Sequence, residues 1–239
     1  MKTGTLGTAT LDALLGDDYS RTRKALIHHP LWEALENAQA SLEQLRAFAL
    51  QDHWLVGHSL QLEALLLAHA TDEAARELLA SKLSDKQVFT VGDGNLLRFG
   101  KALGLSQDDF ENVEPLPGCA ALTTHFYYAL ARDGFLGMLS AITVSESVFI
   151  AICDRAGPAL RRQLGLSSED VAFFTLHDAL KNPVDKLEAQ LIARLANTDE
   201  ARALVRRAAH RSLGFEKLFY DTIYAVGQAV GPSRDRSST

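Results

Sequence analysis

Cysteine and basic residues are scarce in this 239-residue chain, and each shortage excludes a class of protein. The two cysteines, Cys119 and Cys153, are too few for a disulfide framework and lack the close spacing of zinc-binding pairs. This usage is typical of a reducing compartment, so we expect a cytoplasmic protein. The chain has 24 Lys and Arg against 30 Asp and Glu, a net charge of −6. Nucleic acid and anionic membranes are therefore not expected partners, because binding phosphate requires a basic face.

Long apolar runs are also missing. No stretch approaches the roughly 18 apolar residues of a membrane span, so none is predicted. The first 18 residues lack the apolar centre of a signal peptide, and we expect residues 1–18 and 231–239 to be loosely ordered. The chain is 47% hydrophobic and 23% charged, which is ordinary for a globular protein. Residues 1–239 are predicted to form a single domain with a substantial core.

Apolar residues recur at helical spacing along most of the chain, and strand-like alternation is absent. Ser41 and Gln44 form a capping-box pattern that predicts one helix running to about Ala70. Gly92 and Gly94 predict a break. The sequence thus predicts an all-α, multi-helical bundle. Its other helices are expected from about residue 20 with a restart at Pro30, and near 71–87, 95–104, 120–133, 135–155, 168–181, 183–196 and 198–230.

Several polar residues fall on the apolar stripes of these helices, where an ionisable group is costly unless it is paired. Asp52 and Glu63 are eleven residues apart, about three helical turns, so they are expected to point the same way. Glu146, His177 and Glu216 each interrupt an apolar face, and His177 follows Phe173 and Phe174.

Each of these residues has a simpler interpretation when taken alone. A buried carboxylate often caps a helix or pairs with an arginine, and a lone core histidine is usually only hydrogen bonded. His28 and His29, just before a proline, are expected at the surface. Taken together, however, the core carboxylates and the histidine predict a central polar cavity, which helical bundles use to hold a ligand, a cofactor or a metal.

Four stretches form an ordered set of motifs: HPLWEALENAQASLEQLRAFALQDHWLV at 29–56, AITVSESVFI at 141–150, FFTLH at 173–177, and Glu216-x-x-Phe219-Tyr220-Asp221. In this order they resemble the heme-oxygenase-like superfamily, specifically its thiaminase II (TenA), PQQ-synthesis oxidase and diiron-oxidase branches. The first and last stretches are similar to TenA motifs. The middle two are similar to segments that carry metal ligands in the diiron branch. The resemblance implies a heme-oxygenase-like bundle.

The resemblance to the diiron branch implies iron, held here by Glu146 and His177. That branch has further ligands four and seven residues after the histidine, where this chain has Lys181 and Val184. A charged ammonium has no lone pair, and valine cannot bind a metal. A Glu-x6-His pair expected near residues 85–95 is also missing, which leaves Asp93 as a possible third ligand, with Asp52 and Glu63 as alternatives.

The resemblance to TenA implies a different site. Asp52 and Glu216 match active-site carboxylates of that branch, whereas its nucleophilic cysteine is expected near Ser145, where this chain has none. Lys181 would then supply the positive charge that a metal otherwise provides, and Asp52 would act as a general base. Substrate contacts are expected from Trp54, Glu63 and Tyr220.

Three functions remain open from the sequence. The first is an iron-containing redox enzyme that acts on a small molecule in the cavity of the bundle. The second is a metal-free TenA-like hydrolase or small-molecule binder with catalytic residues Asp52, Glu216 and Lys181. The third is a non-catalytic interaction protein on the same fold. By resemblance, a homodimer is expected.

Overall fold

The computed structural model describes residues 6–84, 86–175 and 184–228, and within these ranges the chain is helical and has no strand. Helix accounts for 82% of the structure, which confirms the all-α prediction. The helices are α1 (Leu6–Leu15), α2 (Asp17–Ile27), α3 (Pro30–Glu36), α4 (Leu42–Val56), α5 (Ser59–His69), α6 (Glu73–Ser84), α7 (Lys86–Ala102), α8 (Gln107–Glu111), α9 (Pro117–Leu164), α11 (Val184–Leu195) and α12 (Asp199–Ala225).

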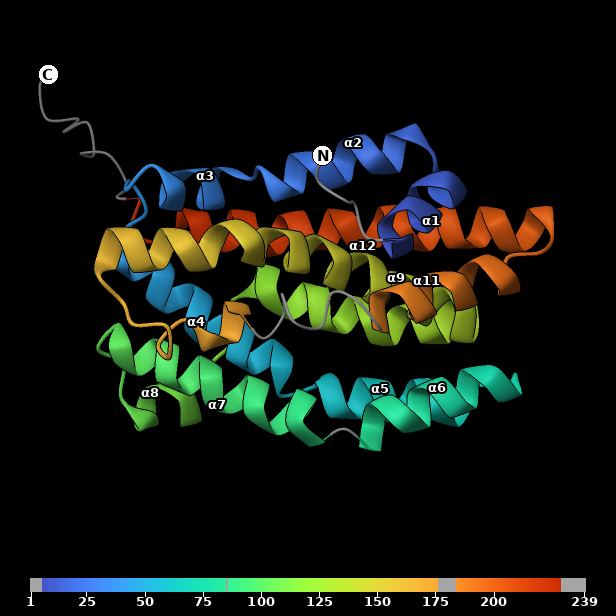
Figure 1. The fold of residues 1–239 in the computed structure, drawn as a ribbon, viewed down its shortest axis with the longest axis horizontal. Helices are drawn as coiled ribbons and strands as arrows, with labels where there is room; N and C mark the ends of the chain where they lie inside the picture. Colours follow the sequence, from blue (N-terminus) through green and yellow to red (C-terminus); the bar gives the residue numbers. More distant parts are fainter. Residues whose placement is uncertain (1–5, 85, 176–183, 229–239) are drawn as a thin grey trace, which may run out of the picture.

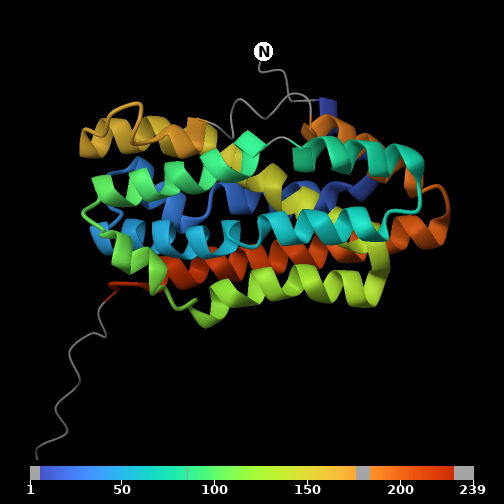
Figure 2. The same cartoon turned by 90° about the horizontal axis from the view of Figure 1, so that it is seen from below.

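The long helices run roughly along one axis of the molecule (Figure 1). Helix α12 runs along most of the length of the molecule (Figure 1). Helices α2 and α3 lie on one side of it, and α5, α6, α7 and α8 form the opposite side of the molecule (Figures 1 and 2). Helices α9 and α12 form the most extensive packed pair, and α4 packs against both of them and against α7. Side chains from α4, α9 and α12 therefore converge in the interior.

Helix α9 reverses direction at Gly134 (Figure 2). Gly134 has φ 69° and ψ −163°, a conformation open to glycine but costly for residues that carry a Cβ atom. The break predicted between the helices at 120–133 and 135–155 is therefore confirmed. The second half continues past the predicted end to Leu164, where Gly165 closes the helix in the left-handed conformation.

The capping box at Ser41 and Gln44 is confirmed, since each side chain bonds the backbone of the other residue. The single helix predicted from there to Ala70 is wrong. A turn at Gly57 and His58 separates α4 from α5, although both residues keep α-region dihedral angles.

Two other expectations are wrong. Helix α7 continues through Gly92 and Gly94, because glycine lowers helix stability without forbidding the helix. Residues 6–15, expected to be loosely ordered, form α1, which buries Leu11 and Leu15 and packs against α11. Burial of these leucines stabilises a helix that the sequence around it does not strongly favour.

An aromatic layer lies between α4, α7 and α9. Phe174 is buried and stacks on Phe48 with ring centroids 5.9 Å apart, and it meets Phe99 edge-on at 5.3 Å. Phe173 is buried as well, so the predicted burial of both phenylalanines is confirmed, but residues 168–171 form a turn and the helix begins at Ala172 rather than at 168. Helix α9 is long and apolar enough to span a membrane, but 67% of its most apolar window is buried inside the fold, as in a core helix.

Candidate functional site

Two carboxyl groups from distant parts of the chain lie buried beside aromatic rings. Asp52 of α4 is 6% exposed and Glu216 of α12 is 4% exposed. Phe48, one turn before Asp52, meets Trp32 edge-on with ring centroids 5.1 Å apart, and Trp32 meets Tyr220 edge-on at 5.4 Å. Because Tyr220 follows Glu216 by one turn, these rings connect the two carboxyl-bearing helices.

The surroundings of Asp52 and Glu216 raise the pKa values of both carboxyl groups. Burial raises the pKa of Glu216 to about 7, opposed by hydrogen bonds from Tyr220 and Ser145, which favour the charged form. Burial and the charge of Glu216 raise the pKa of Asp52 to about 8. Glu216 therefore ionises first, and its charge keeps the proton on Asp52. At neutral pH Asp52 is therefore mostly protonated, while Glu216 is close to the midpoint of its titration.

Two buried serine hydroxyls, one from α9 and one from α12, meet near Glu216. Ser145 Oγ lies 3.2 Å from Ser212 Oγ, and Ser212 donates a 2.7 Å hydrogen bond to the carbonyl of Ala141. Burial, followed by the charge of Asp52, raises the pKa of the Cys119 thiol to about 12. A thiol held neutral is a poor nucleophile, so Cys119 does not replace the cysteine expected near Ser145.

Two buried polar atoms near this pair have no hydrogen-bond partner among the residues that the structure describes. They are Oδ2 of Asp52 and Nε1 of Trp32. An unsatisfied buried donor or acceptor costs about 1–3 kcal/mol, which a bound polar ligand or water would recover.

His29 holds α3 against α12 and helps to position Trp32. It is 3% exposed, so its predicted place at the surface is wrong, whereas His28 is exposed as expected. Its Nδ1 accepts the backbone N–H of Leu31 at 3.2 Å, which leaves Nε2–H to donate to Asp221 Oδ1 at 2.9 Å. Burial lowers the pKa of His29 despite Asp221, so the ring is neutral in this tautomer.

A second buried cluster lies around Lys82 of α6. Its Nζ is 2.6 Å from Glu63 Oε1 of α5, 2.9 Å from Glu188 Oε1 of α11, and 3.5 Å from Glu146 Oε2 of α9. Thr143 also donates a 3.1 Å hydrogen bond to the second oxygen of Glu188. Four helices thus bring one ammonium and three carboxyl groups together.

The carboxylates around Lys82 do not fit the metal expected from the sequence. Glu146 faces an ammonium, which carries positive charge and no lone pair. Within the described ranges no group of three or more His, Cys, Asp or Glu side chains is arranged to hold a metal. His177 and Lys181, as well as the side chain of Asp93, lie outside the described residues.

Asp52 and Glu63, expected to point the same way, meet different partners. Asp52 interacts with Glu216, while Glu63 pairs with Lys82. Trp54 is half-buried, and its ring contacts His58 at 4.5 Å between centroids. Substrate binding by Trp54 stays a prediction.

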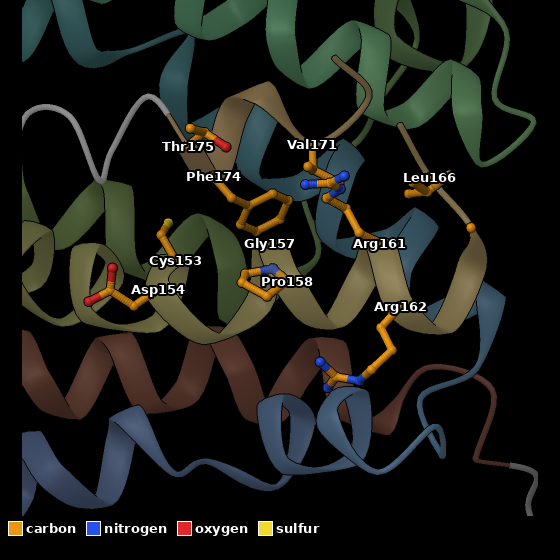
Figure 3. A pocket seen from close by; sticks show the side chains of 11 residues that line it. Cys153, Asp154, Gly157, Pro158, Arg161, Arg162, Leu166, Val171, Phe174 and Thr175 are labelled. Carbon is orange, nitrogen blue, oxygen red and sulfur yellow. The ribbon is translucent and has the colours of Figure 1, made fainter. Parts of the chain in front are cut away.

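A pocket of about 500 Å³ opens between the second half of α9 and residues 166–175. Cys153, Gly157, Arg161 and Phe174 are among the residues that line it (Figure 3). Phe174 belongs to the aromatic layer that includes Phe48, one turn from Asp52. The pocket has the size of a small-molecule site.

Sequence reasoning missed Lys82, Glu188 and Trp32. Lys82 follows Ala75 and Leu79 at seven and three residues, so it falls on the buried stripe of α6. Glu188 lies three and four residues before the buried Leu191 and Ile192. The search for polar residues on apolar stripes that found Asp52 would have found both of them.

Three solved structures are similar in fold over most of the chain. A TenA homolog from Pseudomonas syringae pv. tomato str. DC3000 is 16% identical, covering 93% of this chain and 98% of that one, with a TM-score of 0.77. A TenA homologue from P. horikoshii OT3 is 20% identical, with coverages of 91% and 98% and a TM-score of 0.69. A domain of unknown function with a heme oxygenase-like fold from Shewanella denitrificans OS217 is 15% identical, with coverages of 87% and 89% and a TM-score of 0.74.

These identities show the fold alone, and the bundle is heme-oxygenase-like. The family model described as TENA/THI-4/PQQC matches residues 18–225. That range contains Asp52, Glu216 and the whole Lys82 cluster. Among curated proteins, none matches the chain.

Proposed function

Because the chain belongs to the TENA/THI-4/PQQC family, we propose that it is a metal-independent enzyme that hydrolyses a small nitrogen heterocycle at Asp52 and Glu216. One observation carries the proposal. Two buried carboxyl groups have pKa values near 8 and 7, so an acid and a base coexist at neutral pH. Pairs of titratable groups with separated pKa values identify acid and base roles.

The roles follow from the protonation states. Asp52 is largely protonated at pH 7 and donates a proton, so it acts as an acid rather than the base assigned from sequence. Glu216 is partly ionised and accepts a proton from the attacking water. The water oxygen bonds to the carbon of the substrate, the carbon–nitrogen bond breaks, and Asp52 protonates the departing nitrogen. Tyr220 holds the Glu216 carboxylate in place.

The chemistry of Asp52 favours an amino-substituted heterocycle as the substrate. A neutral carboxyl group presents a donor and an acceptor side by side, and a ring nitrogen next to an amino group presents the complementary pair. The rings of Trp32, Phe48 and Tyr220 pack edge-on beside the pair and make its surroundings apolar. Trp32 Nε1 is a further donor available to it.

Ser145 offers a second route for the nucleophile. Its hydroxyl hydrogen bonds to Glu216, which is the arrangement that activates a serine. Loss of the hydroxyl in Ser145→Ala separates the two routes. A decrease of about 10²-fold or more assigns the attack to Ser145, and a smaller change assigns it to water.

The redox alternative would require a metal held by Glu146 and His177. Glu146 is in contact with the Lys82 ammonium, which opposes a metal at the same place. The observations therefore favour the hydrolase over the iron enzyme.

The proposal is tested with a panel of aminopyrimidines that carry a nitrogen leaving group, with products followed by mass spectrometry. We expect chelator-resistant turnover by the wild type. Asp52→Asn and Glu216→Gln should each lower kcat by about 10²–10⁴-fold, since the amides still form hydrogen bonds but transfer no proton. Glu77→Gln, on the exposed face of α6, is the matched control and should leave turnover unchanged.

Calorimetric titration with the same panel separates an enzyme from a binder. Binding that Asp52→Asn weakens, without turnover of any compound, would reduce the proposal to a binding protein. Absence of both binding and turnover across the panel would contradict it and favour the non-catalytic interaction protein.

A further inference from the structure

The cluster around Lys82 is not used by the function proposed above. Its members come from four helices, and Lys82, Glu63 and Glu188 have side chains that are 7%, 5% and 1% exposed. Glu146 is the most accessible member, with a side chain 26% exposed. The same stretch of α9 therefore serves two sites, because Ser145 faces Glu216 while Glu146 faces Lys82.

Lys82 is held in its charged form. Burial alone lowers the pKa of a lysine, but here Glu146, Glu188 and Glu63 together raise the pKa of Lys82 well above its ordinary value. A protonated amine has no free electron pair, so in this form Lys82 is neither a nucleophile nor a base. Lys82 therefore acts in the cluster as a fixed positive charge.

The cluster holds three carboxyl groups but only one positive charge, that of Lys82. Burial raises the pKa of Glu188 to about 7, against the attraction of Lys82. Glu63 Oε2 is buried and has no hydrogen-bond partner among the described residues, although Oε1 contacts Lys82. A buried carboxylate oxygen without a partner costs free energy, so the cluster has more acceptor oxygens than the ammonium satisfies.

The arrangement is more than a simple salt bridge, because three carboxyl groups surround one ammonium. Oxygen atoms from three helices lie within 3.5 Å of one nitrogen. Hard divalent cations bind carboxylate oxygens at about 2.0–2.6 Å, so an ion in the place of the ammonium would require the cluster to contract, most of all at Glu146, whose oxygen is 3.5 Å from Nζ.

We propose that the Lys82 ammonium is the built-in cation of this cluster, so that it stands in place of a metal ion, and that removing it converts Glu63, Glu146 and Glu188 into a site for one divalent cation. The lysine neutralises the carboxylates without any need for metal supply. It also repels free cations by its charge and by filling the space between the oxygens.

The test is Mn²⁺ binding, followed by electron paramagnetic resonance and calorimetry on purified, chelator-treated protein. Wild type should bind no Mn²⁺ stoichiometrically, and its melting temperature should not change with Mn²⁺ or with chelator. Lys82→Ala should bind one Mn²⁺ per chain, and Mn²⁺ should raise its melting temperature, because a ligand that binds only the folded state stabilises it. Adding Glu188→Gln to Lys82→Ala should weaken Mn²⁺ binding at least tenfold.

Lys101→Ala is the matched control, since Lys101 is exposed at the end of α7. Lys82→Gln is a second variant, because its amide can hydrogen bond to the carboxylates and retain the fold if alanine does not. Stoichiometric Mn²⁺ binding by the wild type, lost in Glu63→Gln, would overturn the proposal. So would folded Lys82→Ala or Lys82→Gln that binds no Mn²⁺.

If neither variant folds, the wild type alone decides between the two outcomes. No Mn²⁺ uptake and a chelator-independent melting temperature support the built-in cation, whereas uptake overturns it. Because this readout involves no substrate, its failure is distinguishable from failure of the hydrolase proposal.

Discussion

The hydroxyl of Tyr220 donates a 2.5 Å hydrogen bond to Oε1 of Glu216, one turn earlier on α12. Both residues are buried, and the bond favours the ionised form of Glu216. Without this donor, burial would keep the carboxyl group neutral over a wider pH range. The pair therefore sets the pH at which Glu216 becomes a base.

Tyr220→Phe should raise the pKa of Glu216 above its present value of about 7, because the variant removes a donor that stabilises the carboxylate. Titration of the Glu216 side-chain carbon by NMR measures this directly. Tyr128→Phe, at an exposed position of α9, is the control and should not move the titration. An unchanged or lowered pKa in Tyr220→Phe would show that the hydrogen bond does not tune Glu216.

The pH profile of turnover should be a narrow bell. Activity should rise through about pH 7 as Glu216 ionises and fall through about pH 8 as Asp52 loses its proton. Because the two groups interact, the limbs report the pair. Glu216→Gln should remove the acidic limb from any residual activity, and Asp52→Asn should remove the alkaline limb. A single broad plateau from pH 5 to 10 would argue against these assignments.

The contribution of Asp52 to stability should decrease as pH rises from about 4 to 8. The folded-state pKa of Asp52 is about 8 and its reference value is 3.8, so the folded protein binds more protons than the unfolded chain in this range. Unfolding then releases a proton, and each such group lowers the free energy of unfolding by at most about 1.4 kcal/mol per pH unit.

Denaturant unfolding of wild type and Asp52→Asn across this range isolates the contribution of Asp52. The variant lacks the titration, so its stability relative to wild type should increase with pH up to about 8 and then level off. Parallel curves would mean that Asp52 is not protonated in the folded state.

Replacing either of two glycines by alanine should change stability, but in opposite directions. Gly134→Ala should destabilise the protein by about 1–3 kcal/mol, because its positive φ strains any residue with a Cβ atom. Gly94→Ala should stabilise it by about 0.5–1 kcal/mol, since Gly94 lies inside α7 and an added Cβ atom has open space. Thermal unfolding of both variants checks the signs. A destabilised Gly94→Ala would contradict the continuous helix.

Much of the fold could be predicted from the sequence, because helix caps and helix breaks depend mainly on residues that are close together in the chain. The capping box at Ser41, the break at Gly134 and the all-α class follow from side-chain spacing and backbone preference. The same rules misplaced a break at Gly92 and missed the one at Gly57. A glycine permits a break, whereas the packing of the helix on its neighbours decides whether one forms.

The sequence by itself determined that charged side chains would be buried, because Asp52, Glu63 and Glu216 lie on apolar stripes whatever the stripes pack against. Only the tertiary structure decided which charges meet. It joined Asp52 with Glu216 and Glu63 with Lys82, across gaps in sequence that helical periodicity does not relate. The physical reason is that burial sets the cost of an ion locally, whereas its partner and its pKa depend on the charges that packing brings within a few ångströms.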